Sequence, residues 1–112
     1  MKIIKKKESG VMILQFQGRI DQLALPQVSS ELMSALGDGS GKVLVDLSKT
    51  DYMTSAGLNA LTEAKKLSVT GGGKLVLCSP SVDLIELFRI VHLEKHFDIY
   101  PTDFEALDKM IP

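Results

Sequence analysis

Two short segments at the start of the chain are rich in apolar residues and are predicted to form β-strands. They cover residues 2–5 and 11–17, and the Ser-Gly pair at 9–10 between them suits a hairpin turn. Further along, the apolar positions repeat every three or four residues, which predicts a helix over about 26–36 with a proline in its first turn. The apolar positions of this helix are Val28, Leu32, Met33, Ala35 and Leu36.

The middle of the chain places a helix between two strongly apolar segments. Residues 43–47 and 75–77 are apolar enough to form strands covered on both faces. A helix is predicted over about 56–69, and its inner face is predicted to carry Gly57, Ala60, Leu61, Ala64 and Leu67. A glycine-rich run at 71–73 ends this helix, and the run at 37–41 ends the helix over 26–36.

The last third continues the alternation of helix and strand. A helix is predicted over about 82–91, a short strand over 97–100 and a last helix over about 102–110. Thr102 followed by Glu105 has the spacing of a capping box, which supports a helix start at this point.

The element order is therefore ββαβαβαβα, and it predicts an α/β fold. Alternation of this kind is typical of a mostly parallel sheet with right-handed crossovers, and the opening hairpin makes the sheet mixed. A chain of 112 residues fits one domain. We therefore expect a single domain over 1–112, with four to five strands packed by about four helices.

Composition and charge narrow the class of protein. The formal net charge of −1 gives no reason to expect binding to nucleic acid, and no apolar run approaches the roughly 20 residues of a membrane span. The basic run 5–7 is predicted to be an exposed strand edge guarded by lysines. A single cysteine, Cys78, and a start without the apolar segment of a signal peptide predict a cytoplasmic protein without direct membrane insertion.

Three patterns that resemble catalytic or metal sites are incomplete. His92 and His96 stand four residues apart, but Leu93 follows where a metalloprotease needs Glu, so a surface pair and no metal are predicted. Ser55 has Gly57 on one side, but Met53 stands where a hydrolase nucleophile needs the second glycine. The glycine-rich runs lack the Ser or Thr of a phosphate-binding loop, and Cys78 is predicted to be a buried structural thiol. No cofactor is therefore expected.

The segment 52–58 has the features of a phosphorylation switch. Thr54 or Ser55 is the natural N-cap of the helix that follows, and a hydroxyl at this position is exposed beyond the end of a strand. Gly57 is expected to keep the helix entry uncrowded so that a partner can approach. A phosphate would bring about −1.5 to −2 charges to the positive end of the helix. It should therefore leave the fold intact and change a docking surface instead.

The sequence resembles the STAS domain family, and within it the single-domain anti-sigma factor antagonists. The resemblance covers essentially the whole chain and includes the segments 18–21, 45–47, 52–58, 74–78 and 97–107. It implies a binding protein that is not an enzyme and that takes part in a partner-switching cycle. In that cycle the unmodified antagonist sequesters an anti-sigma factor that is also an ATP-dependent serine kinase, and the sigma factor is released.

The resemblance also implies how the cycle is reversed. The kinase, with ATP bound in its own site, phosphorylates the serine that matches Ser55, and a PP2C-type serine phosphatase resets the antagonist. Many relatives carry Asp where this chain has Thr54, which leaves Thr54 as a second acceptor after Ser55, and Asp21 matches an acidic position beside the docking surface. The predicted partner-binding residues are Asp21, Met53, Thr54, Ser55, Ala56, Gly57 and Leu58. The alternative is an unphosphorylated STAS subunit of a lipid-transport or signalling assembly.

Overall fold

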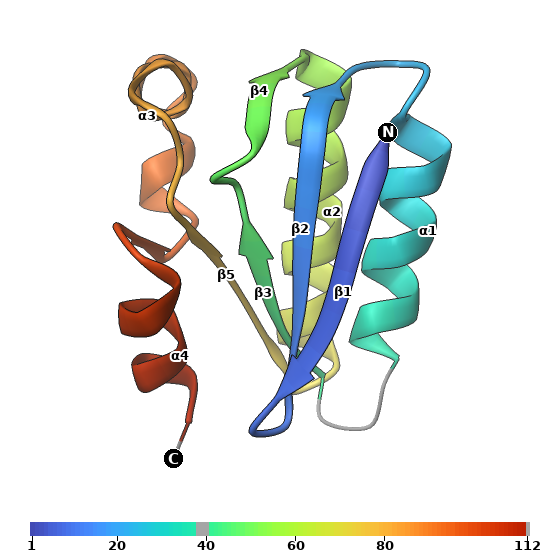
Figure 1. The fold of residues 1–112 in the computed structure, drawn as a ribbon, viewed down its shortest axis with the longest axis vertical. Coiled ribbons are helices and arrows are strands. Elements are labelled where there is room, and N and C mark those ends of the chain that lie inside the picture. Colours follow the sequence, from blue (N-terminus) through green and yellow to red (C-terminus); the bar gives the residue numbers. More distant parts are fainter. Residues whose placement is uncertain (38–40, 112) are drawn as a thin grey trace.

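Six strands form one mixed sheet in the part of the chain that the computed structural model describes, residues 1–37 and 41–111 (Figure 1). The strands are β1 (Lys2–Glu8), β2 (Val11–Ile20), β3 (Lys42–Asp46), β4 (Thr50–Met53), β5 (Lys74–Cys78) and β6 (Ile99–Tyr100). The helices are α1 (Leu25–Leu36), α2 (Ser55–Thr70), α3 (Val82–Ile90), the short 3-10 helix η1 (Leu93–Lys95) and α4 (Asp103–Met110). The predicted α/β class with four main helices is confirmed.

The sheet follows the order β1-β2-β3-β5-β6. β1 and β2 form the predicted antiparallel hairpin, and every other pairing is parallel. The strand missing from the prediction is β4, which pairs with the last three residues of β2, and this pairing contains a bulge between Gly18 and Arg19. In β4 the two end residues are buried and the two central ones are exposed, so its sequence has no strand-like alternation.

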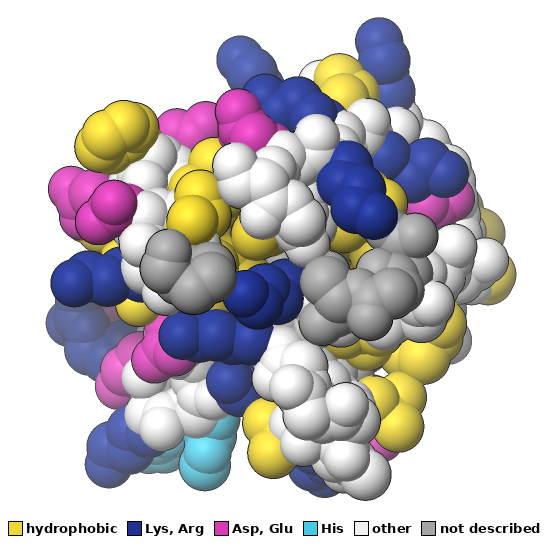
Figure 2. All heavy atoms as spheres, turned by 90° about the horizontal axis from the view of Figure 1, so that it is seen from below, with side chains coloured by type: hydrophobic (Ala, Val, Ile, Leu, Met, Phe, Trp, Pro, Cys, Tyr) yellow, Lys and Arg dark blue, Asp and Glu magenta, His cyan; other side chains and the backbone are white. Residues whose placement is uncertain are grey.

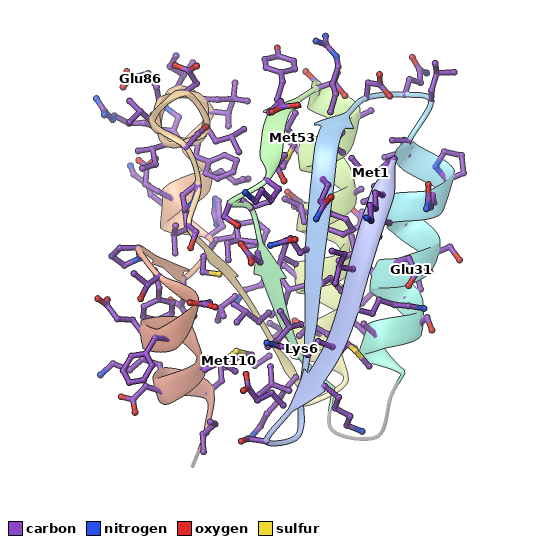
Figure 3. All side chains as sticks on the ribbon, viewed as in Figure 1. Met1, Lys6, Glu31, Met53, Glu86 and Met110 are labelled. Carbon is purple, nitrogen blue, oxygen red and sulfur yellow. The ribbon has the colours of Figure 1, made fainter. Side chains whose placement is uncertain are left out.

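The two faces of the sheet carry different helices. Helices α1, α2 and α3 pack on one face and form the larger core, whereas α4 packs on the other. Val43 and Val45 belong to the larger core, and Leu44 between them belongs to the smaller one, as the strand period of two requires. Met110 points from α4 toward the sheet in this smaller core (Figure 3).

Helix α2 buries a slightly different face from the predicted one. Its buried residues are Gly57, Leu58, Leu61, Ala64 and Ser68. Leu67 was placed on the inner face by its spacing, but it is 50% exposed, and Ser68 takes the inner position. The end of the helix explains the difference, because the Ser68 hydroxyl donates to the Lys65 carbonyl at 2.7 Å and the Ser68 carbonyl accepts from Gly73 N–H at 2.7 Å.

Several local predictions are confirmed at the edges of the molecule. β1 is an edge strand with exposed lysines, and Lys5 Nζ lies 3.2 Å from a carboxylate oxygen of Glu31 on α1. The Thr102 hydroxyl accepts from Glu105 N–H at 3.1 Å at the start of α4. Gly37 caps the end of α1, and residues 38–40 of the glycine-rich run lie outside the described residues. The end of the molecule seen in Figure 2 carries basic and acidic side chains interspersed with hydrophobic ones.

No helix in the described ranges is both long enough and apolar enough to span a lipid bilayer.

Candidate functional site

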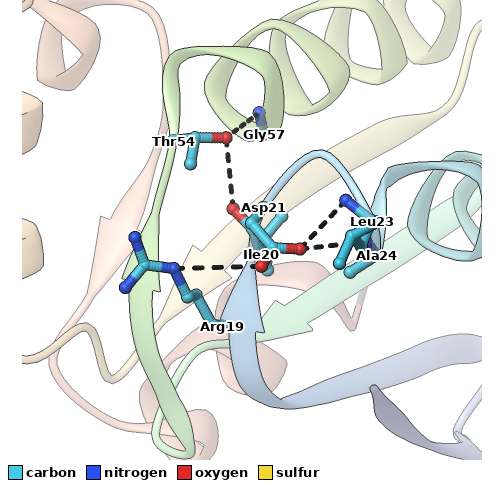
Figure 4. Close-up of polar contacts among 7 residues, drawn as sticks. All are labelled: Arg19, Ile20, Asp21, Leu23, Ala24, Thr54 and Gly57. Carbon is cyan, nitrogen blue, oxygen red and sulfur yellow. Dashed lines mark hydrogen bonds and ion pairs between the residues drawn. The ribbon is translucent and has the colours of Figure 1, made fainter.

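The candidate site lies where the ends of β2 and β4 meet the start of α2, at the upper end of Figure 1. Thr54 N–H donates to the Ile20 carbonyl at 3.0 Å, and the Thr54 hydroxyl donates to the same carbonyl at 3.3 Å (Figure 4). These two bonds join segments that are 34 residues apart in the sequence. The loop after β2 and the first turn of α2 therefore form one connected surface.

Thr54 is the N-cap of α2. Its backbone is extended, with φ −81° and ψ 171°, and its hydroxyl oxygen accepts from Gly57 N–H at 3.3 Å. Ser55 is then the first residue of the helix. Of the two residues predicted as N-cap, the structure selects Thr54, so a capping role for Ser55 is wrong.

The two neighbouring hydroxyls are in opposite situations. The Thr54 hydroxyl donates its proton to the Ile20 carbonyl and accepts from Gly57 N–H, so its proton and one of its two lone pairs are used within the fold. The Ser55 side chain is exposed, and its hydroxyl makes no hydrogen bond with any residue that the structure describes. It also stands at the positive end of α2, where backbone N–H groups and the helix dipole favour an anion. Of the two hydroxyl-bearing residues, Ser55 is the more exposed.

Gly57 has a different role from the one expected from the sequence. It is buried, and a Cβ atom built on it would lie 2.7 Å from Ile20 Cγ2 and 2.7 Å from Met53 Cγ. Met53 itself is buried beside α2 (Figure 3). Glycine is therefore required so that the first turn of α2 can lie directly against β2 and β4. The prediction that Gly57 keeps the helix entry open for a partner is corrected, because the side of Gly57 that lacks a side chain faces Ile20 and Met53 in the core.

Asp21 organises the loop between β2 and α1. Its Oδ1 accepts from the N–H groups of Leu23 at 3.1 Å and Ala24 at 3.0 Å, and its Oδ2 lies 3.9 Å from Arg19 Nε (Figure 4). The carboxylate thus holds the loop immediately before α1 in one conformation. Asp21 is half-buried, so part of it stays accessible at the surface.

The structure adds a contact that the sequence did not indicate. The Arg19 guanidinium lies over the Tyr52 ring, 4.8 Å from its centre, and both side chains are exposed. The pair arises because Arg19 and Tyr52 are register partners on β2 and β4. Since β4 was not predicted, no pattern in the sequence could have brought these two residues together.

The predicted partner-binding residues divide into two groups. Asp21, Thr54, Ser55 and Ala56 are exposed or half-buried at the surface of the site. Met53, Gly57 and Leu58 are buried beneath them, where they support the start of α2. The accessible surface of the site is therefore formed by the first four of these residues.

The two histidines are separated by η1. His92 and His96 are exposed and lie on either side of η1 instead of on one helix face. Within the described residues no group of three metal-ligating side chains comes together. Both histidines lie at the surface, as predicted.

Cys78 is a buried thiol, as predicted, and its burial gives a pH-dependent stability. Burial, and next the negative charge of Asp46, raise the pKa of Cys78 from 9.0 to about 12. The unfolded chain loses this proton near pH 9 and the folded chain does not. The free energy of unfolding should therefore fall as the pH rises from 9 toward 12, by up to about 1.4 kcal/mol per pH unit.

Urea unfolding at several pH values tests this prediction about Cys78. The variant Cys78→Ala serves as the control, because it removes the thiol but leaves every other group that titrates above pH 9. The difference in unfolding free energy between wild type and variant should change over this pH range. A difference that stays constant would contradict the assigned pKa.

Thr54→Val is expected to destabilise the fold by about 1–2 kcal/mol. The change keeps the shape of the side chain but removes the helix cap, and the typical cost of losing a cap is about 1 kcal/mol. It also removes the hydroxyl bond to Ile20. Thr54→Ser, which keeps the hydroxyl, should retain most of the stability in thermal or urea unfolding. Equal losses in both variants would show that the hydroxyl is not the cause.

The chain is similar in sequence and in fold to known proteins. A model of the STAS domain matches residues 2–106. BtrV of Bordetella bronchiseptica, a candidate anti-sigma factor antagonist, is 32% identical over 90 residues, which is 80% of this chain and 78% of that protein. The crystal structure of a candidate anti-sigma factor antagonist from Thermotoga maritima superposes with a TM-score of 0.91 at 21% identity, covering 98% of this chain and 95% of the other. For the phosphorylated form of the Bacillus cell fate determinant SpoIIAA the TM-score is 0.73 at 17% identity, with 96% and 98% covered.

Proposed function

The chain belongs to the STAS domain family, and on this premise we propose that it is an anti-sigma factor antagonist whose activity is reversed by phosphorylation of Ser55. In its unmodified form it binds and sequesters an anti-sigma factor, which frees the sigma factor. The similarity to BtrV over four fifths of the chain supports this proposal. The partner is proposed to be a serine kinase that binds ATP in its own site.

The observation that carries the proposal is the position of the Ser55 hydroxyl. It is exposed at the first residue of α2, whereas the Thr54 hydroxyl beside it donates to Ile20 and accepts from Gly57 within the fold. Phosphorylation at Thr54 would remove the donor to Ile20 and disturb the cap, whereas phosphorylation at Ser55 breaks no hydrogen bond among the described residues. Ser55 is therefore proposed as the acceptor and Thr54 as a structural residue.

The reversal follows from the charge of the phosphate. About −1.5 to −2 charges at the start of α2 interact favourably with the helix dipole, so the fold should tolerate them. A partner surface shaped for a neutral hydroxyl must instead desolvate this charge, and an unpaired charge at an interface costs several kcal/mol. Phosphorylation is thus expected to release the partner without unfolding the antagonist. A PP2C-type phosphatase would restore the binding form.

A reconstitution with purified proteins tests the proposal. A complex of sigma factor and anti-sigma factor from the same organism is mixed with the chain and separated by size-exclusion chromatography. The unphosphorylated chain should displace the sigma factor and migrate with the anti-sigma factor. We propose that it acts in the cytoplasm and without a cofactor. If the sigma factor stays in its complex at a large excess of the chain, the proposed function is wrong. Co-purification with a membrane transporter ATPase would then favour the alternative role as an assembly subunit.

A further inference from the structure

Arg19 presents an exposed guanidinium that is held in place beside the candidate site. The central carbon of this group lies 4.8 Å from the centre of the Tyr52 ring, and its Nε lies 3.9 Å from Oδ2 of Asp21 (Figure 4). The side chain is nevertheless 61% exposed. Contacts with an aromatic ring and a carboxylate restrict the conformations of a long side chain, so less entropy is lost when a partner binds it.

The terminal nitrogens of the Arg19 guanidinium have no hydrogen-bond partner among the described residues. An arginine side chain carries N–H donors on both of these nitrogens, in a planar fork that matches the two oxygens of a carboxylate. Lysine has no such fork, and arginine is the usual choice where a carboxylate is recognised through two bonds. The unused donors of Arg19 therefore suit a carboxylate from another molecule.

The carboxylate of Asp21 is less available to a partner than the guanidinium beside it. Its Oδ1 accepts from the N–H groups of Leu23 and Ala24, and its Oδ2 faces the Nε side of Arg19. The Asp21 side chain is 32% exposed, about half as much as that of Arg19. Of the two charges at this point of the surface, the positive one is thus the one that a partner meets.

A hollow of about 290 Å³ lies beside the guanidinium, and its lining residues include Arg19, Asp21 and Leu23. Leu23 is 92% exposed, the largest exposure among the large hydrophobic side chains of the described residues. The hollow thus offers a cation and an apolar surface to the same incoming side chain. An acidic side chain has both complements, because it carries a carboxylate on an aliphatic stem.

The same surface is joined to Ser55 by short connections. Ile20 lies between Arg19 and Asp21 in the chain, and its carbonyl accepts from both the backbone N–H and the hydroxyl of Thr54. Ser55 follows directly in the chain. A protein that covers Ser55 therefore also comes close to the Arg19 guanidinium. Covering this cation without an anionic partner would be strongly unfavourable.

We propose that Arg19 is a specificity-determining residue of the antagonist, which pairs with a carboxylate of the anti-sigma factor when that protein covers Ser55. This inference rests on the function proposed for Ser55, since it assigns the chemistry of the partner surface beside that residue. Tyr52 is then a positioning residue, because its ring holds the guanidinium in place. Opposite charges across the interface also steer the two proteins together, so the pair should act on the association rate.

Charge reversal at Arg19 tests this inference against a matched control. Arg19→Glu and Arg89→Glu change the net charge of the chain by the same amount. Arg89 lies on α3, outside the candidate site, where its exposed guanidinium is 2.9 Å from a carboxylate oxygen of Glu86. Surface plasmon resonance with the purified anti-sigma factor measures the association rate constant and Kd at low and high NaCl, with and without ATP. Urea unfolding verifies that each variant is folded.

Arg19→Glu should lower the association rate constant and raise Kd by about tenfold or more at low NaCl. The loss should be smaller at high NaCl, because salt screens charges near the surface. Arg19→Gln, which removes the charge without reversing it, should give a smaller loss in the same direction. Arg89→Glu should stay within about twofold of the wild type, since a charge far from the interface has little effect on binding.

The outcomes separate this inference from the proposed function. If the wild type binds and the Arg19 variants bind equally well or more tightly, the partner surface beside Ser55 is not acidic, and the inference is wrong although the proposed function stands. A loss that occurs only in the presence of ATP would assign the anion to the nucleotide phosphates, and it would also overturn the proposed carboxylate. If the wild type itself does not bind the anti-sigma factor, the proposed function fails.

Discussion

Ser55→Asp is expected to weaken binding to the anti-sigma factor at least tenfold while leaving the fold intact. The side chain of residue 55 is exposed at the first position of α2, where a carboxylate interacts favourably with the helix dipole. The folded chain therefore accepts the charge. A partner that covers residue 55 must desolvate it, and a tenfold loss corresponds to only about 1.4 kcal/mol, well within the cost of one unpaired interfacial charge.

Calorimetric titration with the anti-sigma factor measures this effect, and two control variants isolate its cause. Ser55→Asn has a side chain of the same shape as aspartate but no charge, so it should bind more tightly than Ser55→Asp. Ser55→Ala should bind like the wild type and stay bound when ATP is added, because it cannot accept a phosphate. If Ser55→Asp binds as tightly as the wild type, the electrostatic explanation of release is wrong.

Gly57→Ala is expected to lower the free energy of unfolding by about 1–3 kcal/mol, although alanine is the better helix former. The new methyl group would come within 2.7 Å of side-chain atoms of Ile20 and Met53 and within 3.2 Å of the Ile20 carbonyl oxygen. One of these groups must move, and Ile20 is also the residue that accepts both hydrogen bonds from Thr54. The substitution should therefore disturb the presentation of Ser55 and weaken binding as well.

Urea unfolding compares this variant with Gly37→Ala. A Cβ atom at Gly37 would lie 3.6 Å from its nearest neighbour, an ordinary contact, and Gly37 has a φ of −82° that any residue adopts. Its substitution should change the stability by no more than about 0.5 kcal/mol. Equal stability of Gly57→Ala and the wild type would contradict the close packing assigned to the start of α2.

The sequence pattern predicted most of the fold because the apolar periods are strong. The hairpin, the buried strands β3 and β5 and helices α1 to α4 were all expected within a few residues of their observed ends. β4 was missed because its pairing depends on the end of β2 and on a bulge there, which are tertiary features. The prediction of which α2 residues are buried was wrong at Leu67 for a similar reason, since the turn after the helix decides which side chain faces the core.

The sequence predicted which segment carries the candidate site, but not how its side chains are oriented and bonded. A hydroxyl at the start of α2 follows from the sequence, but the choice between Thr54 and Ser55 depends on the Ile20 carbonyl, which lies 34 residues away in the chain. Gly57 was expected to face a partner because glycine often marks a close approach. Other atoms do lie close to Gly57, but they belong to Ile20 and Met53 of the same chain and not to a partner. Whether a residue near a motif faces the core or the solvent depends on such distant contacts.

Mass spectrometry of the phosphorylated chain tests the central claim most directly. The chain is incubated with the purified anti-sigma factor and ATP, digested, and the peptide containing residues 52–58 is fragmented to locate the phosphate. The geometry of the two hydroxyls predicts phosphate on Ser55, none on Thr54, and none on the Ser55→Ala variant. Phosphate on Thr54, or an unmodified peptide when the kinase is active on another substrate, would contradict the account.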